Sequence, residues 1–168
     1  MCTIVPGDKK TKNMNKYIKL LLAVALPLLV GSVAGLATTP NIKDWYQFLE
    51  KPFFSPPNWL FGPMWTLLYI LMGVGYYFIL QAESGELRKR ALNAFYIQLA
   101  LNFAWSFIFF EFRLIGVAFA EIILVWCAVA WMIYTFHPVN KKAALMQIPY
   151  ILWVSFASVL NGTVWALN

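Results

Sequence analysis

The side chains best suited to hold or react with a ligand are aromatic rings and amides that recur at helical spacing within apolar segments. One face carries Trp65, Tyr69, Met72 and Tyr76, a second Phe95, Gln98, Asn102, Trp105 and Phe109, and a third Tyr150, Trp153, Ala157 and Asn161. Faces of this kind usually pack against neighbouring helices. Flat rings with a few amides also suit a large planar apolar ligand, held by stacking and a small number of orienting hydrogen bonds.

A proline-rich aromatic stretch precedes the first of these faces. Pro52, Pro56 and Pro57 each fix φ and restrict the preceding residue, so residues 45–59 are expected to form a stiff, extended loop. On local grounds this is an ordinary turn with aromatic residues at a membrane surface. Three aromatic faces behind it favour a loop that covers a ligand site.

The sequence lacks the side-chain sets of conventional catalysis, such as paired carboxylates, a Ser/His/Asp set, a phosphate-binding glycine loop or a cluster of metal ligands. His137 is the only histidine and precedes Pro138, so we expect it in a solvated loop rather than at a metal. Glu121 stands alone inside an apolar run. A carboxylate there is either functional or simply hydrogen-bonded or protonated within the bundle.

The composition is that of a membrane protein. Of 168 residues, 61% are apolar and 12% are charged, whereas about a quarter of the residues in soluble domains are charged. The net charge of +6 would fit nucleic-acid binding, but the basic residues lie outside the apolar runs, where they direct topology. We therefore expect an all-α integral membrane protein, a five-transmembrane-helix bundle, with no nucleic-acid partner.

The apolar runs predict five spans over residues 18–38, 59–81, 91–110, 114–136 and 143–167. Each approaches the ~20 residues that cross the hydrocarbon of a bilayer as a helix. The first run follows five lysines and has some features of a secretory signal, but it exceeds the roughly 7 to 15 residues of a signal core. Residues 1–16 are expected to form a polar, lysine-rich tail, and residues 17–168 a single five-helix transmembrane domain.

The basic residues are unequally shared between the two ends of this bundle. Ten of the 13 Lys and Arg residues fall in the N-terminal tail and the second and fourth loops, and three fall in the other two loops. The positive-inside rule then predicts a cytoplasmic N-terminus, with the C-terminus and the proline-aromatic loop outside. The small-residue pairs Gly31/Gly35 and Ala100/Ala104 are packing surfaces, used either within the monomer or in a homodimer.

Several motifs occur along the chain in a fixed order. They are Trp45-Tyr46, Lys51-Pro52, Pro56-Pro57-x-Trp59, Gly62-Pro63-Met64-Trp65-Thr66-x-Leu68-Tyr69, Met72-Gly73, Ala100-Leu101-Asn102-Phe103-Ala104-Trp105, Pro149-Tyr150-x-x-Trp153 and Leu160-Asn161. Together they resemble the tryptophan-rich sensory protein and translocator protein family, also called peripheral-type benzodiazepine receptors. The resemblance implies a five-helix membrane protein, commonly dimeric, that binds porphyrins and haem. Animal members also bind cholesterol and synthetic isoquinoline and benzodiazepine ligands.

The resemblance also implies a set of site residues. Carried over position by position, it places around a ligand pocket Tyr46, Trp65, Tyr69, Asn102, Trp105, Trp153 and Ala157, with Pro56 and Pro57 in the loop that closes it. The implied ligand is a porphyrin, protoporphyrin IX or haem, bound without a covalent link and without a metal site in the chain. Sterols and benzodiazepine-type compounds are further candidates. The family's cholesterol motif is broken here, because Gly162 takes the position of its Tyr and no basic residue follows.

Three functions are compatible with these features. The leading expectation is a membrane receptor or sensor for porphyrins and related hydrophobic ligands. A transporter of tetrapyrroles or lipid-like ligands is an alternative, although the sequence shows no inverted repeat or pair of broken half-helices. The resemblance also raises light-driven porphyrin degradation, with Trp65 and Trp153 as the candidate catalytic rings.

Overall fold

The computed structural model describes the backbone of residues 9–168 and the side chains of residues 16–168. Its elements, in chain order, are α1 (Lys9–Asp44), the 3-10 helix η1 (Tyr46–Phe48), α2 (Asn58–Gln81), α3 (Glu86–Ser106), the π-helical turn η2 (Phe107–Glu111), α4 (Ile115–Phe136), α5 (Lys141–Leu145) and α6 (Ile148–Leu167). The structure is 84% helix, and the described residues form no strand. Five helical stretches are long and apolar enough to cross a membrane, which confirms the predicted all-α class.

The first helix is longer than the expected span of residues 18–38. Residues 9–16, expected as part of a polar tail, already belong to α1, and the rest of that tail lies outside the described residues. At its other end α1 continues through Pro40 to Asp44. The hydroxyl of Thr39 donates to the Gly35 carbonyl at 2.6 Å, so a side chain satisfies a backbone acceptor one turn before the proline.

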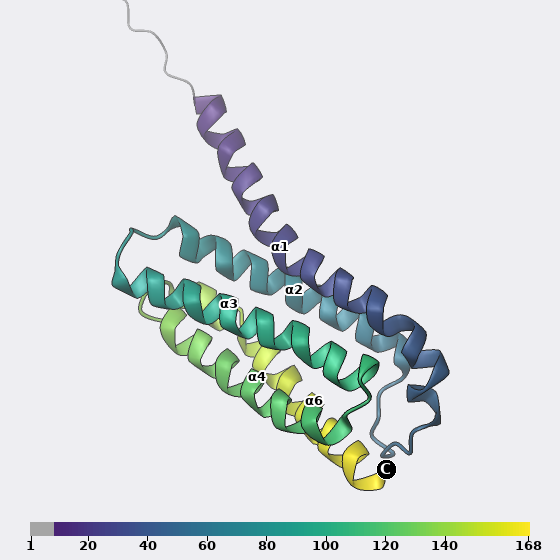
Figure 1. Ribbon diagram of the computed structural model, residues 1–168. Coiled ribbons are helices and arrows are strands. Elements are labelled where there is room, and N and C mark those ends of the chain that lie inside the picture. Colours follow the sequence, from purple (N-terminus) through teal and green to yellow (C-terminus); the bar gives the residue numbers. More distant parts are fainter. Residues whose placement is uncertain (1–8) are drawn as a thin grey trace, which may run out of the picture.

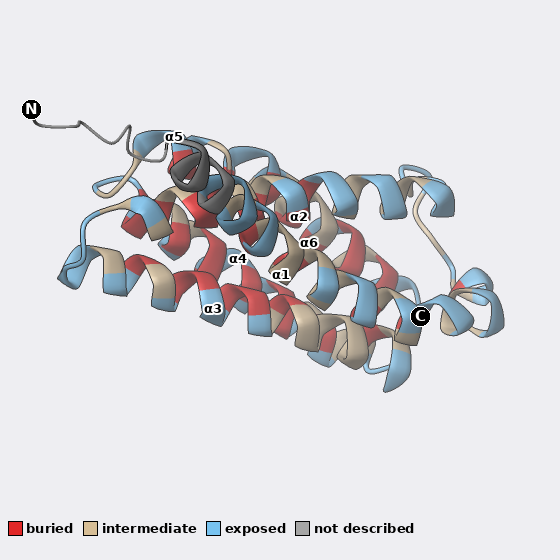
Figure 2. Ribbon diagram, turned by 90° about the horizontal axis from the view of Figure 1, so that it is seen from above, coloured by how far each residue is buried: buried red, intermediate tan, exposed pale blue. Residues whose placement is uncertain are grey.

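The five spans run up and down as a bundle, so that the loop between η1 and α2 and the C-terminus lie at the same end (Figure 1). The closest pairings are α1 with α2, α3 with α4, and α4 with α6. In Figure 2 the buried residues line the inward faces of α2, α3, α4 and α6. The apolar window of α1 is only 17% buried, against 33% to 44% in the other spans, so α1 covers one side of the bundle.

In the half of the bundle nearest the start of α1, α2 packs closely against both α3 and α1. Tyr76 of α2 stacks on Phe95 of α3 with ring centroids 4.2 Å apart. A Cβ on Gly73 would lie 2.5 Å from the Cα of Val24, so glycine is what allows the α1 and α2 backbones to touch. In this half, therefore, the aromatic faces predicted from sequence serve packing.

A chain of buried hydrogen bonds crosses the centre of the bundle. The Tyr69 hydroxyl donates to Oδ1 of Asn102 at 2.7 Å, and Nδ2 of Asn102 donates to the Tyr150 hydroxyl at 3.1 Å. The Tyr150 hydroxyl donates to Oε1 of Gln98 at 3.0 Å, and Nε2 of Gln98 lies 3.1 Å from the sulfur of Met72. These bonds join α2, α3 and α6, and every side chain in the chain of bonds has a partner.

Asn102 holds the middle of this network, so its removal should be costly. We expect Asn102→Ala to lower the free energy of unfolding by about 1 to 3 kcal/mol, because it leaves the buried Tyr69 hydroxyl without a partner and removes the donor to the Tyr150 hydroxyl. Thermal unfolding in mild detergent measures this. Asn93→Ala removes the same amide from an exposed position of α3 and is the matched control. Equal stability of the two variants would show that the network contributes no net stability.

The turn between α3 and α4 ties the loop end of the bundle together. Arg113 has a positive φ of 57°, unusual for a residue other than glycine. Its Nη2 donates to Oδ1 of Asn41 at 3.2 Å, and its guanidinium lies over the ring of Trp45. Nδ2 of Asn41 in turn donates to Glu111 at 2.9 Å. The end of α1 and the start of the proline-aromatic loop are thereby anchored to the η2 turn.

Candidate functional site

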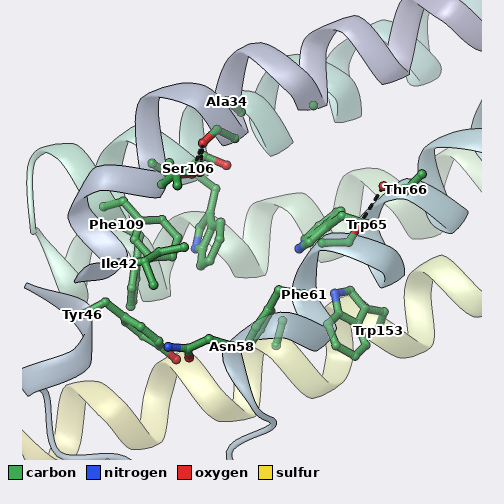
Figure 3. Close-up of a pocket in the computed structure, with 18 of the residues that line it drawn as sticks. Ala34, Ile42, Tyr46, Asn58, Phe61, Trp65, Thr66, Ser106, Phe109 and Trp153 are labelled. Atoms are coloured by element: carbon green, nitrogen blue, oxygen red, sulfur yellow. Dashed lines mark hydrogen bonds between the residues drawn. The ribbon is translucent and has the colours of Figure 1, made fainter. Parts of the chain in front are cut away.

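A cavity of about 490 Å³ lies between α1, α2, α3 and α6 on the loop side of the hydrogen-bond network. Figure 3 shows aromatic side chains entering it from several directions. Its lining residues are Leu28, Gly31, Ser32, Ala34, Gly35, Thr38, Thr39, Ile42, Tyr46, Asn58, Trp59, Phe61, Gly62, Trp65, Thr66, Tyr69, Trp105, Ser106, Phe109, Phe110, Trp153, Ala157, Leu160, Asn161 and Val164. The volume falls within the range of about 300 to 1,000 Å³ typical of small-molecule sites.

The α2 wall of the cavity is formed by Trp65 and Tyr69, one helical turn apart. Their rings lie 5.6 Å apart and are inclined by 30°, and Trp65 also meets the edge of Tyr150 at 6.2 Å. Because Tyr69 is hydrogen-bonded to Asn102, its ring is fixed from behind. The wall is therefore a pre-formed aromatic surface on rigid helices.

The opposite wall combines Trp105 of α3 with residues of α6. Nε1 of Trp105 donates to Oδ1 of Asn161 at 3.2 Å, and Nδ2 of Asn161 donates to the Ile115 carbonyl at 3.1 Å. Trp105 also stacks on Phe109 with centroids 5.2 Å apart. The indole of Trp105 is thus fixed in orientation, with its polar atom already paired.

Trp153 of α6 differs from Trp105 in this respect. Its ring contacts Phe61 and Phe156, at centroid distances of 6.0 and 5.5 Å. Its Nε1 is buried and has no hydrogen-bond partner. A buried indole N–H without an acceptor is unfavourable by itself. Because protein atoms cover this nitrogen, the Trp153 ring must turn before the N–H can donate to a ligand in the cavity.

The loop end of the cavity is closed by Tyr46 of η1. Tyr46 packs against Phe109 and Phe110, with centroids 6.0 and 5.6 Å apart. Burial raises the pKa of the Tyr46 phenol, and a hydrogen bond with Ser55 partly offsets that rise. Nζ of Lys51 lies 4.7 Å from the centre of the Tyr46 ring, and burial lowers the pKa of this amine. Tyr46 therefore enters the cavity as a neutral phenol.

The structure brings together six of the residues implied by the family resemblance. Tyr46, Trp65, Tyr69, Trp105, Trp153 and Ala157 all line the cavity. Three others do not line it. Asn102 is buried behind Tyr69, and Pro56 and Pro57 precede α2, where Pro57 is the N-cap residue. The prolines affect the cavity indirectly. They set the start of α2, the helix that brings Asn58, Trp59 and Phe61 to the cavity.

The α1 wall is absent from the predicted site residues. A Cβ on Gly31 would collide with the ring of Tyr69, whereas a Cβ on Gly35 would meet no atom within 4 Å. Both glycines line the cavity. Of the two uses predicted for the pair, the structure shows the one within the monomer. In the sequence, the spacing of the two glycines indicated a packing surface. It did not indicate a ligand site, because glycine has no side chain that could contact a ligand.

Other residues singled out in the sequence lie away from the cavity. Glu121 is buried in α4, and neither of its carboxylate oxygens has a hydrogen-bond partner among the described residues. His137 is exposed beyond the end of α4. Gly162 packs tightly against the ring of Phe119, so the altered end of the sterol motif serves helix contact. The part of the chain described here contains no group of three or more potential metal-binding His, Cys, Asp or Glu residues.

Comparison with known proteins agrees with the family that the sequence motifs indicate. The profile of the TspO/MBR family matches residues 23–166. The tryptophan-rich protein TspO of Archaeoglobus fulgidus is 39% identical over 153 residues, which cover 90% of this chain and 97% of that protein. The translocator protein of Homo sapiens is 39% identical over 126 residues, covering 74% and 75% of the two chains. The tryptophan-rich sensory protein of Cereibacter sphaeroides is 34% identical over 149 residues, covering 87% and 92%. This five-helix membrane protein therefore belongs to the TspO/MBR family.

Proposed function

We propose that this protein is a membrane receptor for porphyrins, which bind in the cavity between α1, α2, α3 and α6. The supporting observation is the pairing of a ring-lined cavity with the unpartnered N–H of Trp153. Rings on both sides suit stacking on a flat macrocycle, and a buried donor suits one of its polar substituents. The walls are mostly apolar, with a minority of hydroxyl and amide side chains, so the ligand is drawn from the membrane or from a carrier rather than from free solution.

Titration of the purified protein with protoporphyrin IX in darkness tests this proposal. Quenching of tryptophan fluorescence and a shifted porphyrin absorption band are expected to saturate together at one ligand per chain. Loss of saturation in the presence of a competing flat hydrophobic compound would confirm a shared site. Porphyrin uptake that rises linearly with detergent rather than with protein would contradict the proposal.

Iron should contribute little to this binding. Among the described residues that line the cavity there is no His, Cys or Met, so they offer haem iron neither an imidazole nor a sulfur ligand. The hydroxyl of Tyr69 is already bonded to Asn102, and Tyr46 is a neutral phenol rather than a phenolate ligand. We therefore propose that protoporphyrin IX and haem bind with affinities within about an order of magnitude of each other, a difference of about 1.4 kcal/mol. A haem spectrum with imidazole or thiolate ligation would show that the ligand sits elsewhere.

A second candidate function is light-driven porphyrin breakdown. Trp65 and Trp153 both line the cavity, so a bound macrocycle would lie beside two oxidisable rings. In this scheme dioxygen is the net oxidant, and an indole exchanges single electrons with the excited porphyrin. Trp65→Phe and Trp153→Phe keep the aromatic surface and are expected to slow the loss of bound porphyrin under light. Equal rates in wild type and both variants, at matched occupancy, would show that the loss needs neither of these two rings.

For the orientation we propose a cytoplasmic N-terminus, as the distribution of Lys and Arg predicts. After replacement of Cys2 and Cys127 by serine, a cysteine at position 55 is expected to react with an impermeant thiol reagent from outside. A cysteine at position 89 is expected to react only after the membrane is opened. Labelling of both positions from the same side would overturn the five-span topology.

We further propose a homodimer that uses the α3 face carrying Ala100 and Ala104. Ala100 is exposed and Ala104 is partly exposed, whereas Gly31 is committed to contact with Tyr69 inside the chain. Ala100→Leu and Ala104→Leu together are expected to shift the protein to monomers in mild detergent. Light scattering with correction for bound detergent measures the change. An unaltered mass in the double variant would exclude this face as the interface.

A further inference from the structure

A second cavity lies at the other end of the α1–α2 pair, away from the proposed porphyrin site. Its volume is about 370 Å³, and its walls include Leu22 and Leu26 of α1, Tyr76 and Leu80 of α2, and the basic side chains Lys19 and Arg88. The porphyrin cavity begins only at Leu28 and ends at Tyr69 on the same two helices. The two cavities share no lining residue.

The two basic side chains stand where a membrane has its headgroups. Lys19 lies just inside the first apolar span, which begins at Lys16, and Arg88 lies just inside the third, which begins at Glu86. The apolar wall residues continue from there toward the membrane interior. The cavity thus places two cations at the depth of lipid phosphates and an aliphatic surface at the depth of acyl chains.

The guanidinium of Arg88 makes one hydrogen bond and no ion pair within the described residues. Its Nη1 donates to the Ala82 carbonyl at 3.3 Å, at the C-cap of α2. Its Nε is buried and has no partner. Within the described residues the one ion pair joins Arg90 to Glu86 at 3.7 Å, so no carboxylate neutralises Arg88 or Lys19. A planar guanidinium that has no ion pair is suited to bind phosphate oxygens through its terminal N–H groups.

From these observations we propose that this cavity binds an anionic phospholipid from the leaflet that faces the start of α1. The phosphate lies between Lys19 and Arg88, and one acyl chain lies along Leu22 and Leu26. A single-chain surface contact would not need a cavity. The choline of a zwitterionic lipid would bring a third positive charge close to Lys19 and Arg88, whereas an anionic headgroup brings none. The site is independent of the porphyrin proposal, because the two cavities are separate.

Lipid titration of the full chain in dodecyl maltoside tests this site, with native mass spectrometry as the readout. Dioleoylphosphatidylglycerol is expected to bind, dioleoylphosphatidylcholine to bind more weakly, and glycerol 3-phosphate alone not to bind measurably. Each basic side chain near the surface contributes about 1 kcal/mol, so Arg88→Gln and Lys19→Gln should each weaken phosphatidylglycerol binding about fivefold. Lys89→Gln removes the same charge from an exposed neighbouring position outside the cavity and should leave binding unchanged.

Three outcomes would overturn the proposal. Equal weakening by Arg88→Gln and Lys89→Gln would show a diffuse charge effect rather than a site. Equal affinity for the two phospholipids would show that Lys19 and Arg88 do not select an anionic headgroup. Binding of glycerol 3-phosphate as tightly as the lipid would make the site one for soluble phosphates. Because Arg88→Gln also removes a contact to the end of α2, the unfolding temperature without lipid and the charge-retaining Arg88→Lys variant separate loss of fold from loss of binding.

Discussion

Gly35→Phe is expected to lower the affinity for protoporphyrin IX by at least about tenfold, or about 1.4 kcal/mol, without loss of stability. Gly35 lines the cavity, and a Cβ at this position meets no atom within 4 Å. A phenyl ring added there is therefore expected to extend from an open position into ligand space. Fluorescence titration measures the affinity, and thermal unfolding measures the stability.

Two other glycines provide the controls for this variant. Gly85 lies in the loop between α2 and α3, where a Cβ also meets no atom within 4 Å, so Gly85→Phe should change neither quantity. Gly31 faces Tyr69, so Gly31→Phe should lower the unfolding temperature as well as the affinity. Full porphyrin affinity in a stable Gly35→Phe protein would place the ligand outside this cavity.

Truncation of the cavity tryptophans is the second large effect that we expect. Trp65→Ala and Trp153→Ala each remove stacking surface and leave a void, which should weaken porphyrin binding by about 1 to 3 kcal/mol, or roughly 5- to 150-fold. Trp153→Phe keeps most of the surface but removes the unpartnered N–H. The affinity lost in Trp153→Phe therefore measures the hydrogen bond. The additional affinity lost in Trp153→Ala measures the stacking surface.

Trp165 is the matched control for these substitutions. It stacks on Phe119 with centroids 5.7 Å apart and does not line the cavity, although it belongs to the same helix as Trp153. Trp165→Ala should leave porphyrin affinity within about twofold of wild type, well under 1 kcal/mol. A loss in Trp165→Ala as large as that in Trp153→Ala would indicate a general disturbance of α6 rather than lost ligand contact.

The helices and the inward direction of the aromatic faces follow from local information. Apolar runs of sufficient length predicted the five spans, and the period of the rings predicted which faces are buried. Phe95, Gln98 and Asn102 are buried in the structure as their spacing required. Even the ends of most helices followed from loops that contain charges, because charged residues are excluded from the hydrocarbon.

Periodicity could not predict which residues of those faces pack against other helices and which line a cavity. Tyr76 and Trp65 share one face of α2, yet the Tyr76 ring stacks on Phe95 while Trp65 lines the proposed porphyrin cavity. The difference depends on what the other helices present at each level. On the α1 side of that cavity, Gly35 leaves room instead of filling it. Such a void is set by the joint placement of four helices, whereas periodicity describes one helix at a time.

The extension of α1 through Pro40 has a similar explanation. Proline usually ends a helix within the preceding residues, and the span predicted from the apolar run stopped at residue 38. In the structure the helix beyond Pro40 is held by tertiary contacts, since Asn41 bonds to both Glu111 and Arg113. These partners are some seventy positions away in the chain, beyond the reach of any local pattern.

The side chains that fasten the centre of the bundle are all uncharged. Tyr69, Asn102, Tyr150 and Gln98 offer phenols and amides to one another, and dissolved ions screen interactions between charges rather than bonds of this kind. Ionic strength should therefore leave the helix arrangement and the shape of the cavity unaltered. Added salt can therefore be used to test the charged groups of the ligand and protein without disturbing the fold. Any change in ligand affinity with added salt would report the ligand's own ionised groups or the basic residues at the bundle ends.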